Sequence, residues 1–271
     1  MMLRILAAVV LLPLLLLMLL WLPTWVTAVV CGVAAAIAAY ELLWGTGLVK
    51  HIRLTIYTAV MACLVAIWSC FGTSYLPALI AVLLFTVALF AEVLYSKATI
   101  RFEQIAVCLA GGLLIPFLLS ALVRIHNADQ GRIFVLIPFV LAFMSDSGAY
   151  FVGCAIGKHK LAPTISPKKS VEGLFGGIAG SVLGMMIYCV VLQHFFGFQV
   201  NYLWAALYGV LGSLTSTFGD LCFSAIKRQN GIKDYGNLIP GHGGVLDRFD
   251  SMTVVAPLTE ILLLLLPVAV K

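Results

Sequence analysis

Residues 76–95 read LPALIAVLLFTVALFAEVLY, and this stretch decides the class of fold. Glu92 is its single charged residue, and a helix needs about 20 apolar residues to cross the hydrocarbon core of a bilayer. Similar runs recur along the whole chain of 271 residues, of which 63% are hydrophobic and 10% are charged. In soluble domains about 45–50% of residues are hydrophobic and about 25% are charged. The sequence therefore excludes a soluble enzyme and predicts an all-α, polytopic integral membrane protein.

Apolar windows and their polar interruptions predict nine transmembrane helices. The expected ranges are 3–22, 25–44, 52–71, 76–95, 105–122, 133–156, 174–198, 204–226 and 252–270. We expect one membrane domain, residues 1–271, in which residues 1–132 form five scaffold spans and residues 133–271 form four catalytic spans. Two cytoplasmic loops, 157–173 and 227–250, belong to the catalytic part. Acidic residues of the scaffold, such as Glu41 and Glu92, are expected at helix ends, in solvent or among lipid headgroups.

The distribution of basic residues predicts the orientation, because cytoplasmic loops of membrane proteins are enriched in Lys and Arg. Thirteen of the sixteen fall on the side of the N-terminus, and Arg124, Arg132 and Lys271 fall on the other. This bias indicates a cytoplasmic N-terminus, an external C-terminus and motif loops that face the cytoplasm, in a cytoplasmic or inner membrane. It also accounts for the net charge of +5 without a nucleic-acid partner.

The expected helix 204–226 carries a polar stripe. Ser213, Ser216, Thr217, Asp220, Ser224 and Lys227 recur at three- and four-residue intervals. A charge deep in a bilayer costs about 2.5–3.5 kcal/mol, so Asp220 should face a polar cavity or a cation. The alternative is a hydrogen-bonded seam of Ser and Thr between helices. Asp146, in the helix 133–156, invites the same argument, either as a ligand or as part of a cavity wall.

Glycines form a second pattern, on the expected helix 174–198. Gly173, Gly176, Gly177, Gly180 and Gly184 make a face of small residues that lets another helix approach closely. This face suits packing within the chain and equally suits a homodimer.

The two long loops contain most of the remaining polar residues. Loop 157–173 combines lysines, hydroxyl groups and a helix N-terminus, which suits an anion site or a grip on anionic lipid headgroups. Loop 227–250 alternates acids and bases with glycines and His242, which favours a phosphate and metal site. Zinc is not expected there, because neither a thiolate nor a second histidine is near.

Together these motifs resemble the phosphatidate cytidylyltransferases, also called CDP-diacylglycerol synthases, over roughly residues 143–252. The family signature is occupied at Ser224, Lys227, Arg228, Lys233, Asp234, Gly236, Ile239, Pro240, His242, Gly243, Gly244, Asp247, Arg248 and Asp250. Upstream blocks at 146–150, 166–173 and 219–221 are also similar. Ser170 stands where the family more often has Thr, a departure that keeps the hydroxyl.

The resemblance implies that CTP and phosphatidate react to give CDP-diacylglycerol and pyrophosphate, with Mg²⁺ required. It implies Asp220 and Asp247 as metal ligands, and Asp146, Asp234 and Asp250 as further candidates. The clamp on the triphosphate and pyrophosphate would consist of Lys168, Lys169, Lys227, Arg228, Lys233 and Arg248. Nucleotide binding would also involve Ser166, Ser170, Ser224, His242, Gly243, Gly244 and Asp250. Whether a second, monovalent cation joins Mg²⁺ stays open.

Three other functions compete with this one. A transporter or channel would use Asp146 and Asp220 as an ion or proton relay, but it leaves the two basic loops unexplained. A related enzyme would use CTP on an isoprenoid or ether-linked lipid, and the sequence does not distinguish its lipid cavity. A purely structural scaffold is the weakest hypothesis, because it leaves buried charge uncompensated.

Overall fold

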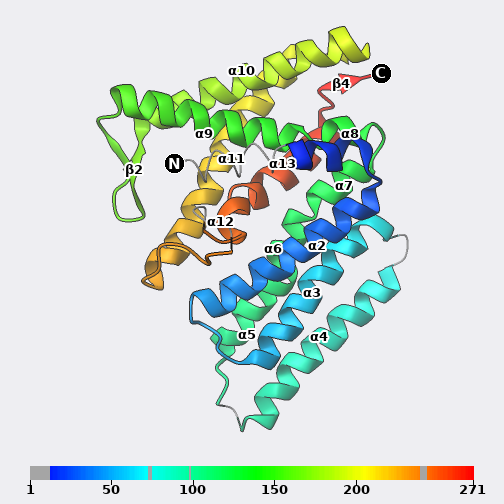
Figure 1. Cartoon of the computed structure of the whole chain (residues 1–271), viewed down its shortest axis with the longest axis vertical. Helices are drawn as coiled ribbons and strands as arrows, with labels where there is room; N and C mark the ends of the chain where they lie inside the picture. The colour runs from blue at the N-terminus through cyan, green and yellow to red at the C-terminus, as the bar shows by residue number, and fades with distance from the viewer. Residues whose placement is uncertain (1–12, 73–74, 98, 239–242) are drawn as a thin grey trace. The chain divides into compact units, whose positions relative to one another are not determined.

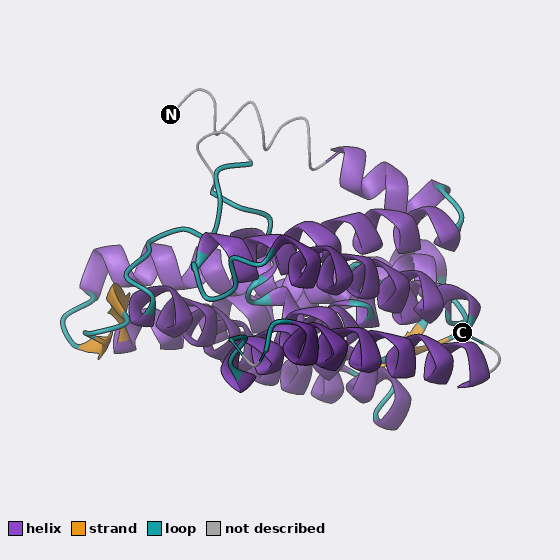
Figure 2. Ribbon diagram, turned by 90° about the horizontal axis from the view of Figure 1, so that it is seen from below, coloured by secondary structure: helices purple, strands orange, loops and turns teal. Residues whose placement is uncertain are grey.

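The structure, a computed structural model, describes residues 13–72, 75–97, 99–238 and 243–271, and these are mostly helical (Figures 1 and 2). Within these ranges six helical segments are long and apolar enough to cross a membrane. They are 24–45, 52–71, 75–95, 102–127, 131–156 and 171–196. The predicted class, an all-α integral membrane protein, is thereby confirmed, whereas the count of nine spans stays a prediction.

The chain forms two compact units. The first contains the chain up to Arg132 together with Lys227–Phe249, and the second contains Ile133–Ile226 together with Asp250–Lys271. The loop that follows Lys227 therefore belongs to the same unit as the N-terminal spans, which we expected to act as scaffold.

The first unit is built from helices and two π-helical turns. Its elements are α2 (Thr24–Tyr40), η1 (Glu41–Gly45), α3 (Ile52–Phe71), α4 (Tyr75–Tyr95), α5 (Phe102–Leu109), η2 (Ala110–Leu114), α6 (Ile115–Leu119), α7 (Ala121–Asn127) and α12 (Leu246–Phe249). Small side chains let α2 and α3 approach closely, with Ala35 and Ala39 against Ala62. A Cβ on Gly32 would lie 3.1 Å from Cys63 Sγ, so a larger residue there would require its neighbours on α3 to shift by a few tenths of an ångström.

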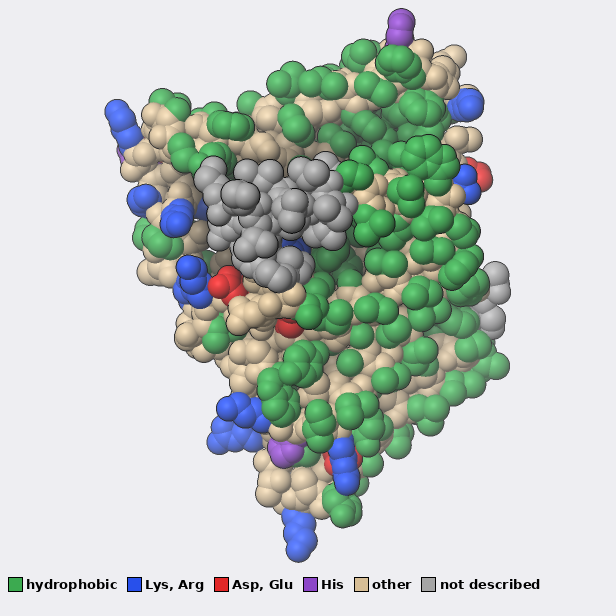
Figure 3. Space-filling view, viewed as in Figure 1, with side chains coloured by type: hydrophobic (Ala, Val, Ile, Leu, Met, Phe, Trp, Pro, Cys, Tyr) green, Lys and Arg blue, Asp and Glu red, His purple; other side chains and the backbone are tan. Residues whose placement is uncertain are grey.

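The outer face of α4 is almost entirely hydrophobic (Figure 3). Leu83, Leu84 and Leu94 are 58%, 62% and 80% exposed, and only Phe85 and Leu89 of this helix are buried. Such exposure is unfavourable in water but is expected of a helix that faces lipid hydrocarbon. The surface of α4 therefore agrees with its assignment as a membrane span.

The second unit combines long helices with two short sheets. Its elements are α9 (Ile137–Ile156), β1 (Lys160–Ala162), β2 (Ser166–Ser170), α10 (Val171–Phe196), β3 (Gln199–Val200), α11 (Tyr202–Gln229), α13 (Met252–Leu265) and β4 (Ala269–Val270). The short helix α8 (Gly131–Phe134) crosses from one unit to the other in sequence, as does the end of α11. Strands β1 and β2 pair antiparallel at one end of α9 and α10, and β3 and β4 pair antiparallel at the other end (Figure 1).

The glycine face predicted on α10 packs against α9 within the chain. A Cβ on Gly180 would lie 2.6 Å from Met144 O, and a Cβ on Gly148 would overlap Gly176 O. The two helices therefore touch backbone to backbone, as small-residue faces allow.

The span predictions differ from the described structure mainly near the C-terminus. The predicted span 204–226 lies inside α11, which has 28 residues. The predicted span 252–270 is wrong in length, because α13 has 14 residues, about 21 Å, and a chain needs about 30 Å of helix to cross the core alone. Leu266 leaves the helical conformation because it precedes Pro267. The predicted span 3–22 lies partly outside the described residues.

Candidate active site

A polar cavity of about 540 Å³ lies in the second unit, between α9, the β1–β2 hairpin, α10 and α11. Two carboxylates, Asp146 and Asp220, line it together with three lysines, Lys160, Lys168 and Lys169. Five of the residues predicted from the sequence thus reach one cavity: Asp146, Lys168, Lys169, Ser170 and Asp220. The polar stripe of α11 contributes Thr217 and Asp220 to its wall, as a charged residue within a membrane helix requires.

Asp220 is held on both of its oxygens. Lys169 Nζ lies 2.5 Å from Oδ2, and Ser224 Oγ, one helical turn further along α11, donates a hydrogen bond of 3.1 Å to Oδ1. The side chains of Lys169 and Asp220 are 25% and 31% exposed, so water and ions can reach the pair. An anion that enters the cavity can therefore compete with Asp220 for the lysine.

The sequence predicts a loop over residues 157–173, the segment that presents the lysines. It is instead a two-stranded antiparallel ribbon, closed at its base by Glu172. The Glu172 carboxylate accepts hydrogen bonds from the backbone N–H groups of Lys158 and His159 and lies 2.6 Å from His159 Nδ1. Ser170 caps α10, because its Oγ accepts a hydrogen bond of 3.1 Å from Gly173 N. The lysines therefore stand on a rigid support.

A second cluster lies in the first unit, around Asp247 of α12. Lys227 Nζ lies 2.7 Å from Asp247 Oδ1, and the two side chains are only 9% and 3% exposed. Asp247 Oδ2 accepts hydrogen bonds from Tyr235 N, at 2.8 Å, and Gly244 N, at 3.0 Å. Asp247 thus holds two points, Tyr235 and Gly244, of residues 230–245, here termed the glycine loop. Gly243 has φ +86°, a conformation that favours glycine.

Glu41 braces the same loop from the N-terminal spans. Its two carboxylate oxygens accept hydrogen bonds from Val245 N, at 3.0 Å, and Leu246 N, at 2.8 Å, where α12 begins. A Cβ on Gly236 or Gly244 would lie 2.5 Å from a Glu41 oxygen. The expectation that Glu41 is solvated or lies among headgroups is wrong, since it is 4% exposed. Its charge within an apolar run was the signal that could have marked it.

The other predicted site residues have more open surroundings. Arg228 Nη1 donates to Ile232 O at 3.0 Å, and Lys233, Asp234 and Arg248 are exposed. Asp250 Oδ1 accepts a hydrogen bond of 2.7 Å from Ser251 N. Ser166 lies in β2 but does not line the polar cavity. His242 lies outside the described residues.

The donor set of the polar cavity suits a hard divalent cation. Among the described residues no three His, Cys, Asp or Glu side chains come together as a complete metal cage. Mg²⁺ is commonly held by one or two carboxylates together with substrate phosphates and water. Asp146 and Asp220, which line one cavity beside lysines that attract phosphate, fit that pattern. The assignment of Asp247 to the metal stays a prediction, as both its oxygens already accept protein hydrogen bonds.

Comparison with known families decides the classification. The model of the cytidylyltransferase family matches residues 2–266, nearly the whole chain. The chain belongs to the cytidylyltransferase family. This membership confirms the resemblance drawn from the motif loops, and it extends to the N-terminal spans, which include Glu41.

Individual members of the family are similar over shorter stretches. A phosphatidate cytidylyltransferase of Bacillus subtilis is 39% identical over 170 residues, which cover 62% of each chain. Those of Staphylococcus epidermidis and Staphylococcus aureus are 42% and 43% identical over 139 and 141 residues, which cover 51% of this chain and 52% of theirs. The chain thus spans about half to three-fifths of the length of the relatives it matches.

Proposed function

We propose that the protein is a phosphatidate cytidylyltransferase, which converts CTP and phosphatidate to CDP-diacylglycerol and pyrophosphate. The observation that carries this proposal is the polar cavity, where lysines of the β1–β2 hairpin meet carboxylates of α9 and α11. The names of the relatives supply the substrates. A lipid phosphate and a nucleotide triphosphate are both polyanions, so a cavity for them needs fixed positive charge.

The reaction requires that the two substrates be aligned, and it does not require a nucleophile from the protein. An oxygen of the phosphatidate phosphate attacks the α-phosphorus of CTP, and the bond from this phosphorus to the oxygen that bridges to the β-phosphorus breaks. The electron pair leaves with pyrophosphate. The attacking phosphate is already ionised at neutral pH, so no base is needed to activate it.

Lys169 has the central role in this scheme. In the structure it is paired with Asp220, so its ammonium group is directed into the cavity before substrate arrives. Phosphate oxygens replace Asp220 as its partner, which leaves Asp220 Oδ2 open to a cation. Lys160 and Lys168, on the same hairpin, add charge along the wall.

We propose Mg²⁺ as the cation, held by Asp146 and Asp220. When bound, Mg²⁺ neutralises charge on the phosphates and on the leaving pyrophosphate. The buried pair of Lys227 and Asp247 and the Glu41 brace fix the described parts of the glycine loop.

We also propose that the N-terminus and the polar cavity face the cytoplasm, in the inner membrane of a bacterium. CTP is a cytoplasmic solute, and the basic hairpin lies on the side that the positive-inside rule assigns to the cytoplasm. Phosphatidate reaches the same side through the membrane.

The decisive experiment measures pyrophosphate release from CTP by the purified, detergent-solubilised protein, with and without phosphatidate and Mg²⁺. We expect release only with all three components and a lipid product with the mass of CDP-diacylglycerol. Release without lipid would indicate hydrolysis, and release only with an isoprenoid or ether-linked phosphate would indicate another acceptor. Ion uptake by proteoliposomes without turnover would indicate a transporter.

A pair of variants links the activity to the polar cavity. Lys169→Ala should lower kcat/KM about 100-fold, because it removes a charge that contacts the reacting phosphates. Lys50→Ala removes an equal charge from an exposed site in the other unit and should leave the rate unchanged. Equal rates in the two variants would contradict the role of the cavity.

A further inference from the structure

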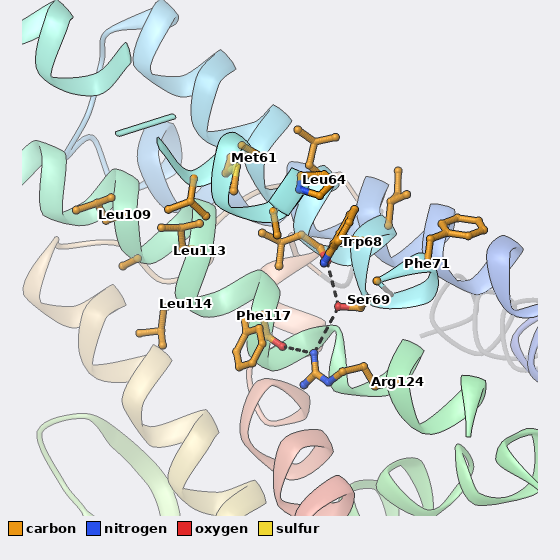
Figure 4. Close-up of a pocket in the computed structure, with 18 residues that line it drawn as sticks. Met61, Leu64, Trp68, Ser69, Phe71, Leu109, Leu113, Leu114, Phe117 and Arg124 are labelled. Carbon is orange, nitrogen blue, oxygen red and sulfur yellow. Dashed lines mark hydrogen bonds between the residues drawn. The ribbon is translucent and has the colours of Figure 1, made fainter. Parts of the chain in front are cut away.

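A second cavity lies among the described residues of the first unit and takes no part in the proposed reaction. It has a volume of about 1130 Å³ and is lined by α3, α4, α7 and the segment from α5 to α6 (Figure 4). Binding sites for small organic ligands usually measure about 300–1,000 Å³. Its wall is apolar except for Ser69, Arg124 and the indole nitrogen of Trp68. We refer to it as the apolar cavity.

The length of the apolar cavity matches one leaflet of a bilayer. Along α3 its wall runs from Met61, near the middle of the span, to Gly72, just beyond the end of the helix. Eleven residues of helix rise about 16 Å, and half of the hydrocarbon core is about 15 Å. The opposite wall runs from Leu109 to Phe117 in the same direction. An acyl chain that enters from the helix ends would fill the cavity without crossing the midplane.

A fixed positive charge lies at the end of the apolar cavity, where the spans end. Arg124 Nη1 donates hydrogen bonds to Ser120 Oγ, at 2.7 Å, and to Phe117 O, at 3.1 Å. Its guanidinium also lies over the Phe117 ring, 4.6 Å from the centroid. These contacts hold the charged group in place at the end of the apolar cavity. Arg124 is therefore preorganised at the depth of lipid headgroups.

We propose that the apolar cavity binds one anionic glycerophospholipid, with an acyl chain between α3 and α4 and with its phosphate against Arg124. An apolar wall alone would accept any lipid chain, whereas a guanidinium at the headgroup level selects a net negative headgroup. The lipid links four helical segments that otherwise leave a void of this size, so it stabilises the unit. This site is separate from the polar cavity in every lining residue.

The test combines native mass spectrometry with added lipids. The purified protein is mixed with equal amounts of phosphatidylglycerol and phosphatidylcholine, and the lipid retained on each chain is identified by mass. We expect one lipid per chain, with phosphatidylglycerol favoured about tenfold. Arg124→Gln should bind lipid without this preference. Arg132→Gln removes an exposed charge that the cavity does not contain, and it should behave like the unaltered protein.

A second set of variants tests the cavity rather than the charge. Ala81→Trp places a large side chain in the space for the acyl chain and should abolish retention of either lipid. If Ala81→Trp does not fold, Ala78→Leu is the milder replacement on the same wall. It should lower retention of either lipid severalfold. Retention in both filled variants, or an unchanged preference in Arg124→Gln, would overturn the proposal. Pyrophosphate release is measured separately, so an inactive protein would leave this result intact.

Discussion

Asp220 and Asp247 each pair with a lysine, but their surroundings give the two carboxylates different tasks. Asp220 is 31% exposed beside the polar cavity, and a surface pair of this kind contributes at most about 1 kcal/mol to stability. Asp247 is 3% exposed, and each of its oxygens accepts a hydrogen bond from within the protein. The first is arranged for exchange of partners and the second for rigidity.

Asp220→Asn should therefore remove activity but not stability. We expect kcat to fall about 100-fold or more, because the carboxylate is a proposed cation ligand and the amide is neutral. The midpoint of thermal unfolding should stay within about 3 °C. Both are measured on the same purified sample. A variant with full activity would contradict the assignment of Asp220 to the metal.

Asp247→Asn should instead lower stability more than activity. It leaves the ammonium group of Lys227 buried without its partner, and loss of one member of a buried ion pair costs about 3–5 kcal/mol. We expect a clear fall in the unfolding midpoint. Lys227→Met together with Asp247→Asn removes both charges and should recover part of the lost stability, which a double-mutant cycle measures. Independent, additive effects would show that the pair is not coupled.

Glu41→Gln tests whether the brace on the glycine loop needs a carboxylate. The amide group can accept only one of the two backbone hydrogen bonds, and its NH₂ would face the other N–H. We expect kcat to fall about tenfold or more with little change in the KM for CTP, as hydrogen bonds to charged groups contribute about 1.5–3 kcal/mol. Glu92→Gln, which removes the carboxylate paired at 3.5 Å with the exposed Arg53, is the matched control. Glu41→Asp should recover part of the activity if the role is positioning.

At the scale of the elements, the α9–α10 pair supplies part of the wall of the polar cavity. Asp146 stands on α9, and the hairpin with Lys169 leads directly into α10. Because the two helices touch through glycine backbones, any added side chain in the contact separates them. The spacing of the helices therefore sets the width of the site.

Gly148→Ala is expected to lower both stability and activity. Its Cβ would overlap the carbonyl of Gly176, which is backbone and cannot turn aside. Overpacking of this kind costs about 1–3 kcal/mol, and the unfolding midpoint should fall by several degrees. Ala155→Ser, at an exposed position of the same helix, serves as the control. A Gly148→Ala variant as stable as the control would mean that the helices are farther apart than described.

At the scale of the whole molecule, the proposed orientation rests on the sequence, which puts thirteen basic residues on one predicted side and three on the other. Of the seven cysteines, all within the described ranges, Cys154 is exposed, and it lines the polar cavity. A maleimide that cannot cross membranes should label it in inverted vesicles and not in intact cells, and CTP should slow the labelling. Cys154→Ser gives the background. Labelling in intact cells alone would reverse the proposed orientation.

The spans could be predicted well because the hydrocarbon core of the bilayer requires predominantly apolar residues along the whole length of a span. The predicted span 52–71 coincides with α3, and the predicted span 76–95 differs from α4 by one residue. The hairpin at 160–170 was missed because lysines and prolines there show no strand alternation. The polar stripe located Asp220, since its spacing is local. Glu41 was missed because its partners lie more than 200 residues away, and a pairing of that kind leaves no local pattern.

The separation between Glu41 and the glycine loop has a consequence for how the protein is made. A ribosome adds about 5–20 residues per second, so about 10–40 s pass between the synthesis of Glu41 and that of Val245. During this interval the N-terminal helices have already been delivered to the membrane, but the Glu41 carboxylate has not yet met the backbone N–H groups of Val245 and Leu246. The first unit can therefore reach its final form only near the end of translation, and a nascent chain that stops before residue 245 would expose a charged helix to membrane quality control.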